Sequence, residues 1–208
     1  MWYPPKVTVP PTDEPVTLVE AKAECGVTGT ARDDELTLKI AAARAFVEQH
    51  CTIFLMTQTV AVTCDCFDDL GHVAVAPLQS VTSIKYFDLD GLEQTVADTV
   101  YEERLDALSP SIVAKPGQRW PSKQAGTRIT LTAVAGYGDA SEVPPNIKQA
   151  VLLHVLSAAN VAARNALVRQ EEVAGIGNVQ YGGVVEVSGV VIQAVERLLE
   201  GYRRWPLT

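Results

Sequence analysis

The chain has 208 residues, of which 47% are hydrophobic and 20% charged, and its formal net charge is −8. This balance is typical of a globular protein and excludes an intrinsically disordered chain. The negative charge argues against non-specific nucleic-acid binding by the whole surface, although it leaves room for a local basic patch. The first residues lack the basic start and apolar run of a signal peptide. We therefore expect a cytoplasmic compartment and reduced cysteines.

The N-terminal part predicts an arm followed by two helices. Residues 1–16 contain five prolines and predict an extended arm, either free or laid over a neighbouring subunit. Residues 17–53 predict a helical part, in which Thr17 and Glu20 form a capping box and Gly26 ends the first helix. The second helix begins with an acidic turn that suits its dipole. Its predicted apolar stripe is Leu36, Ile40, Ala43 and Val47.

Residues 54–138 predict a small antiparallel β unit inserted between the second and third helices. Alternation of mainly apolar with mainly polar residues over 57–66 and 127–135 is typical of half-buried strands. Asp90-Gly91 is a strong signal for the turn of a hairpin. The other predicted strands are 73–75, 81–88, 92–96, 99–104 and 111–114.

The four cysteines are Cys25, Cys51, Cys64 and Cys66. Cys64 and Cys66 lie two residues apart in a predicted strand, so both should point to one face. A metal site would need further ligands at suitable spacing, and none lie nearby in the sequence. We interpret the cysteines as core thiols, because free cysteine is among the most buried residue types.

Residues 139–164 predict a long core helix that is apolar on nearly every side. Pro144 and Pro145 suit a first helical turn. The regular apolar face contains Ile147, Ala150, Val151, His154, Val155, Ala158 and Ala162. Such a helix is buried on more than one side, by its own core and by a neighbouring subunit. The residues predicted for the subunit interface are Leu152, Leu153, Leu156 and Val161.

The C-terminal part predicts a loop, a helix and a tail. Residues 165–188 are rich in glycine and predict a mobile loop with room for one transient hairpin. Residues 189–208 predict a last helix, capped by Ser188, and a tail. The expected apolar face of this helix is Val191, Ala194, Val195, Leu198, Tyr202 and Trp205.

No catalytic motif emerges from the sequence. A nucleophile elbow, a P-loop, an HExxH motif and a dinucleotide fingerprint are all missing. We interpret His154 as a core histidine with one satisfied nitrogen. A hidden active site would instead require His154, Asp65 and Asp106 to approach one another. Arg203-Arg204-Trp205 suits either phosphate contact or a protein interface.

Several motifs, in this order and spacing, resemble the tailed-phage head–tail connector family, also called adaptor or head-completion proteins. This family includes relatives from prophages and gene transfer agents. The resemblance covers roughly residues 15–164, and the glycine-rich stretch 165–188 is longer than the family pattern. The motifs are Pro15–Lys22, Ile40–Glu48, Gln58-Thr59, Pro77–Tyr86, Asp90-Gly91, Gly136-Tyr137-Gly138 and Val143–Ala150.

The resemblance implies an α+β fold, with a small bundle of about four helices and the β unit between helices two and three. It implies a structural protein without enzymatic activity or cofactor, assembled in the bacterial host cytoplasm into the virion neck. Its partners would be the portal protein, a stopper or tail-completion protein, and other copies of itself in a ring, usually of twelve on the portal. DNA would pass through the ring without sequence-specific binding, and no membrane is involved. The implied portal-docking residues are Tyr202, Arg203, Arg204, Trp205, Pro206 and Leu207.

Two alternatives stay open. The first is a small enzyme or ligand-binding protein, which predicts a deep pocket with convergent polar groups and a perturbed pKa. The second is another ring protein of the same particle, such as a stopper or tail terminator. A β-rich chain without the Val143-Pro144-Pro145 helix start would have favoured that second alternative.

Overall fold

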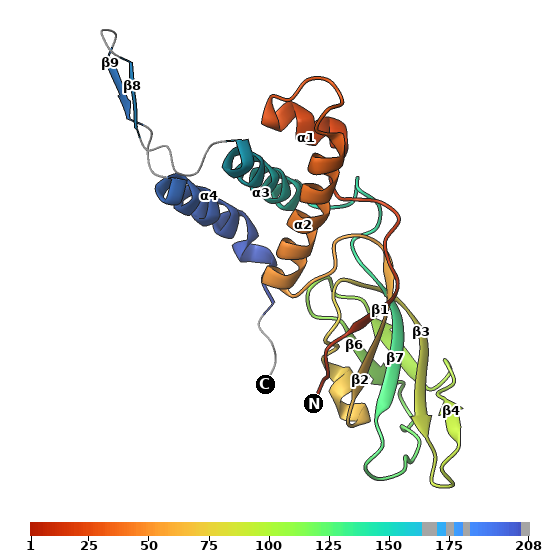
Figure 1. The fold of residues 1–208 in the computed structure, drawn as a ribbon. Coiled ribbons are helices and arrows are strands. Elements are labelled where there is room, and N and C mark those ends of the chain that lie inside the picture. Colours follow the sequence, from red (N-terminus) through yellow and green to blue (C-terminus); the bar gives the residue numbers. More distant parts are fainter. Residues whose placement is uncertain (164–169, 174–176, 181–183, 205–208) are drawn as a thin grey trace. The chain divides into compact units, whose positions relative to one another are not determined.

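The computed structural model describes residues 1–163, 170–173, 177–180 and 184–204, and the side-chain surroundings of 1–159 and 191–204. The chain divides into two compact units (Figure 1). Unit 1 comprises Met1–Asp13, Glu48–Val143 and Tyr202–Thr208, and unit 2 comprises Glu14–Val47 and Pro144–Gly201. The β unit follows the second helix and precedes the third, so the predicted α+β class is confirmed.

The described residues form four α-helices, as the sequence predicts. No described helix is both long and apolar enough to cross a bilayer. The helices are α1 (Leu18–Cys25), α2 (Asp33–Cys51), α3 (Pro145–Ala163) and α4 (Val184–Leu199), with 3₁₀ turns η1 (Phe67–Gly71) and η2 (Glu200–Tyr202).

An antiparallel sheet of five strands forms the centre of unit 1, in the order β1-β2-β7-β3-β4. Two further pairs of strands, β5-β6 and β8-β9, are also antiparallel. The strands of the sheet are β1 (Lys6–Val9), β2 (Gln58–Cys64), β3 (Leu78–Phe87), β4 (Glu93–Thr95) and β7 (Ile129–Ala135). The paired strands are β5 (Tyr101–Arg104), β6 (Ser111–Ala114), β8 (Gln170–Val173) and β9 (Gly177–Gln180).

The two central strands bury every second residue, which confirms the predicted alternation. In β2 and β7 the buried positions alternate strictly with half-buried ones. Their register places Val60 opposite Ala133 and Val62 opposite Leu131, so buried side chains meet across the ladder. The hairpin around Asp90-Gly91 is also confirmed, because it joins β3 to β4.

The N-terminal arm is part of the sheet. Its residues Lys6–Val9 form β1, which pairs with β2 at one edge. The sequence allowed an arm that was free or laid over a neighbour, but the structure pairs it with its own chain. Its four residues are all exposed, so no buried alternation marked them as a strand.

Three local predictions are wrong. Residues 73–75 are not a strand, although Val73 and Val75 are fully buried, because the Val73 N–H bonds the carbonyl of Pro110. Ser188 does not cap the last helix, since α4 already begins at Val184. Cys66 is exposed, because β2 ends at Cys64 before the alternation reaches it.

Unit 2 follows the predicted helix signals. Thr17 and Glu20 form the capping box of α1, and Gly26 ends that helix in the left-handed conformation. Helix α3 packs against both α1 and α4 (Figure 1). The predicted stripe of α2 is fully buried. The buried side chains of α3 and α4 are Ile147, Ala150, Val151, Val155, Ala159, Val195 and Leu199.

Candidate docking surfaces

The end of the described chain is anchored on unit 1. The Arg204 backbone N–H donates to the carbonyl oxygen of Cys51 at 2.9 Å. Its guanidinium donates from Nη1 to the Ala74 carbonyl at 3.0 Å and from Nη2 to the Val73 carbonyl at 2.8 Å. Burial lowers the pKa of Arg204. This predicted docking residue therefore holds its own chain in place.

Two groups near this anchor, Tyr137 and Cys51, are neutral at pH 7. Burial, with smaller effects of Tyr202 and Cys51, raises the pKa of Tyr137 to about 12. Burial also raises the pKa of the Cys51 thiol to about 11. Tyr202 is half-buried and Arg203 is exposed. The other predicted docking residues, Trp205, Pro206 and Leu207, lie outside the described residues.

Three helices of unit 2 border an open apolar cavity, which we call the α-helical groove. Its volume is about 340 Å³. The His154 ring stacks on Phe46, with 4.4 Å between ring centroids and 18° between the planes. The groove is lined by Phe46 of α2, His154, Ser157 and Ala158 of α3, and Val191, Ile192 and Val195 of α4.

The predicted interface residues of α3 occupy intermediate positions. Leu152, Leu153 and Leu156 are all half-buried, and none of them lines the groove. Val161 belongs to α3, but its side chain lies outside the described part. The assignment of these four residues to a subunit interface stays a prediction.

His154 differs from the expected core histidine. It is half-buried at the groove, and the structure gives its ring a stacking contact and no hydrogen bond among the described residues. Burial lowers its pKa from 6.5. The imidazole is therefore neutral at pH 7, and the groove carries no charge.

The lowered pKa of His154 predicts a loss of stability in acid. In the unfolded chain the imidazole takes up its proton first, because its pKa there is higher. We expect the free energy of unfolding to fall as the pH drops below about 6.5. Urea denaturation at pH 7.5 and 5.5 should show a smaller fall in a His154→Gln variant. Identical falls in both proteins would contradict this prediction, since the carboxylates and the other histidines are common to both.

The three residues that a hidden active site would need are divided between the two units. His154 belongs to unit 2, whereas Asp65 and Asp106 belong to unit 1. Asp65 accepts a hydrogen bond from Tyr3 Oη at 3.1 Å. No group of three or more His, Cys, Asp or Glu side chains in the described part could hold a metal ion.

The cysteines do not form a metal centre either. Cys51 and Cys64 are buried and Cys25 is half-buried. The exposed Cys66 donates from Sγ to Asp69 Oδ2 at 3.1 Å.

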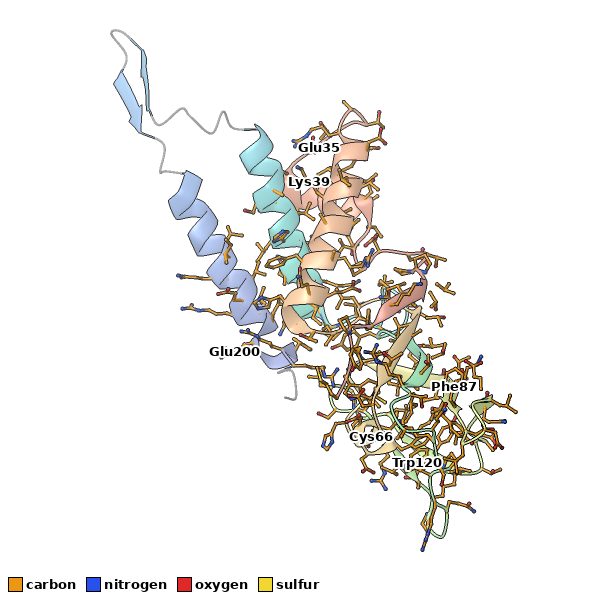
Figure 2. All side chains as sticks on the ribbon, turned by 60° about the horizontal axis from the view of Figure 1, so that its bottom comes forward. Glu35, Lys39, Cys66, Phe87, Trp120 and Glu200 are labelled. Atoms are coloured by element: carbon orange, nitrogen blue, oxygen red, sulfur yellow. The ribbon has the colours of Figure 1, made fainter. Side chains whose placement is uncertain are left out.

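The ring of Phe67, which follows Cys66, stacks on Trp120 with 5.0 Å between centroids, and Figure 2 shows this region of unit 1.

Sequence reasoning missed three residues of the groove, Phe46, Ser157 and Ile192. None of them lies on the apolar face predicted for its helix. A usable signal existed on α2, because Ala42 and Phe46 are apolar, lie four positions apart and fall outside the predicted stripe. Such a second face predicts that the helix has more than one packing partner.

No protein-family model matches the chain, and no curated protein matches it. The chain is similar to chains of three solved structures. For a neck of an empty GTA (gene transfer agent) particle computed with C6 symmetry, the TM-score is 0.71 at 21% identity, covering 99% of this chain and 98% of that chain. For a virion of a native gene transfer agent particle, the TM-score is 0.67 at 21% identity, covering 98% of this chain and 97% of that chain. For a neck of a native GTA particle computed with C12 symmetry, the TM-score is 0.60 at 22% identity, covering 94% of this chain and 96% of that chain. At such identities, the likeness shows a shared fold over nearly the whole chain.

Proposed function

We propose that the protein is a structural connector in the neck of a tailed phage or phage-like particle. The single observation that carries this proposal is the fold, which matches chains of gene transfer agent particles from end to end. A shared fold alone does not fix a function. The motif resemblance to head–tail connectors points independently in the same direction.

In this proposal the protein works by geometry and without turnover. Copies close into a ring under the portal, extend the DNA channel and offer a platform for the stopper or tail-completion protein. The apolar groove of unit 2 and the half-buried leucines of α3 supply surface for contacts between copies.

Native mass spectrometry, alone and with the portal protein of the same particle, tests the ring. Twelve copies of the 22.4 kDa chain give about 270 kDa, far from a monomer or dimer. We expect this mass, or a portal carrying twelve copies. A chain that stays monomeric in both samples would overturn the proposal.

Portal docking through the C-terminal tail is tested by a short deletion. Removing residues 205–208 leaves the Arg204 anchor in place, so the fold of unit 1 should persist. We expect portal co-purification to be lost while the thermal melting curve is unchanged. Undiminished co-purification would remove the docking role of Trp205, Pro206 and Leu207.

A further inference from the structure

Helix α2 has a second apolar face that the described residues leave exposed. Leu38 is 72% exposed, and Ala42 and Ala45 are exposed as well. These residues are four and three positions apart, so they line one side of the helix over about 10 Å. They lie on the opposite side from the buried stripe that begins at Leu36. We call Leu38, Ala42 and Ala45 the α2 ridge.

Several charged residues beside the α2 ridge are already paired, whereas Asp34, one turn before Leu38, is exposed. Lys39 Nζ lies 3.3 Å from Glu35 Oε1, and Figure 2 labels both residues on α2. Arg32 donates to the same carboxylate at 2.9 Å. Arg44 pairs with Glu14 at 2.8 Å. Covering the ridge would therefore strip water from few unpaired charges, which keeps the cost of burial low.

The α-helical groove has the matching character. Ile192 at its rim is 48% exposed, and its wall contains the neutral stacked pair of Phe46 and His154. Every other lining side chain except Ser157 is aliphatic. An apolar side chain that enters this groove leaves water without losing a hydrogen bond.

The ridge cannot fill the groove of its own chain. Phe46, which borders the groove, follows Ala45 directly on the same helix. A rigid helix cannot turn its outer face into a cavity that it walls itself. A ridge of this kind that fills the groove therefore belongs to a second copy of the chain.

We propose that the α2 ridge of one copy seats in the α-helical groove of the next copy. Leu38 is the side chain that enters, and the two alanines allow the helices to approach closely. Ridge and groove consist of different residues, so the contact is heterologous and can repeat around an axis until a ring closes. This inference rests on the proposed ring and names the surfaces that form it.

Paired cysteines test the contact directly. In a chain carrying Cys25→Ser and Cys66→Ser, we introduce Leu38→Cys and Ile192→Cys, singly and together. Under mild oxidation the double variant should give a ladder of covalent oligomers on a non-reducing gel, and each single variant should stay monomeric. Covalent dimers of a single variant would mean that like surfaces meet, which overturns the heterologous contact.

Mixing two charge variants gives an independent test. Leu38→Asp disrupts only the ridge and Ile192→Asp disrupts only the groove. Each variant should therefore lower the fraction of the protein that is assembled at least about tenfold. Mixed in equal amounts, they should form a dimer through the one intact ridge and the one intact groove. Val19→Asp is the matched control, because Val19 is 75% exposed on α1 and lies outside both surfaces. Unchanged melting curves must accompany each variant.

The outcomes separate this contact from the proposed function. A wild-type ring with no ladder in the double variant overturns the ridge–groove contact and leaves the neck connector intact. A ring lost equally in the Val19→Asp control also contradicts the assignment. A wild-type chain that stays monomeric even with the portal overturns both proposals.

Discussion

Replacing Gly136 by alanine is expected to abolish the fold of unit 1. Gly136 directly follows β7 and has a φ of +117°, a conformation that side chains with a Cβ rarely adopt. A Cβ at this position would overlap the Met56 carbonyl and lie 2.8 Å from the backbone nitrogen of Thr57. The Gly136 N–H also donates to the Pro77 carbonyl at 3.0 Å, so the backbone is held from both sides. We expect a loss of more than about 4 kcal/mol in the free energy of unfolding.

A second glycine separates backbone strain from the steric clash. Gly117 has a φ of +80°, and a Cβ there would meet nothing within 4 Å. Gly117→Ala should therefore cost only about 1–2 kcal/mol, the price of a left-handed residue. Urea denaturation of both variants measures the difference. Equal losses in the free energy of unfolding would mean that unit 1 relaxes around the new Cβ at Gly136. The close approach of Met56 and Thr57 would then not destabilise the variant.

Local sequence signals account for most of the elements. The alternation in β2 and β7, the capping box of Thr17 and Glu20, and the turn at Asp90-Gly91 each involve residues close together in the chain. Their geometry follows from side-chain period and local hydrogen bonds, so no distant contact is needed to predict them.

The missed features depend on distant contacts. Strand β1 is fully exposed, and only its pairing with β2, some fifty residues away, makes it a strand. Val73 and Val75 have the apolar pattern of a strand, but the carbonyl of Pro110 takes the N–H that a ladder would need. The spacing of apolar residues in the sequence does not show which distant group will accept a hydrogen bond from a given backbone N–H.

The candidate surfaces were predictable only in part. The excess apolar surface of α3 was visible in the sequence, but the sequence does not show which side chains α4 covers. The groove combines residues of three helices, from Phe46 to Val195, so it exists only after they pack. The assignment of the C-terminal segment to portal docking stays a prediction, and the partners of Arg204 could not be predicted from the sequence.

Replacing Arg204 by methionine is expected to detach the C-terminal segment from unit 1. The guanidinium satisfies the carbonyls of the half-buried Ala74 and the fully buried Val73. Hydrogen bonds from a charged donor contribute about 1.5–3 kcal/mol each, and an orphaned buried carbonyl adds a desolvation cost. We expect Arg204→Met to lower the free energy of unfolding by about 3 kcal/mol. Arg119→Met removes the same charge from an exposed site of unit 1 and should change the free energy of unfolding little.

The Arg204→Met substitution should also weaken binding to the portal, because the tail that follows Arg204 starts from this anchor. At a temperature where Arg204→Met remains folded, portal co-purification should fall, whereas Arg204→Lys should keep part of it by reaching one carbonyl. Urea denaturation and co-purification, measured on the three variants Arg204→Met, Arg204→Lys and Arg119→Met, make the comparison. If Arg204→Met melts like the Arg119→Met control, water satisfies the two carbonyls, and the anchor has no structural role. If it is destabilised but binds the portal as wild type does, the segment docks without being positioned by Arg204.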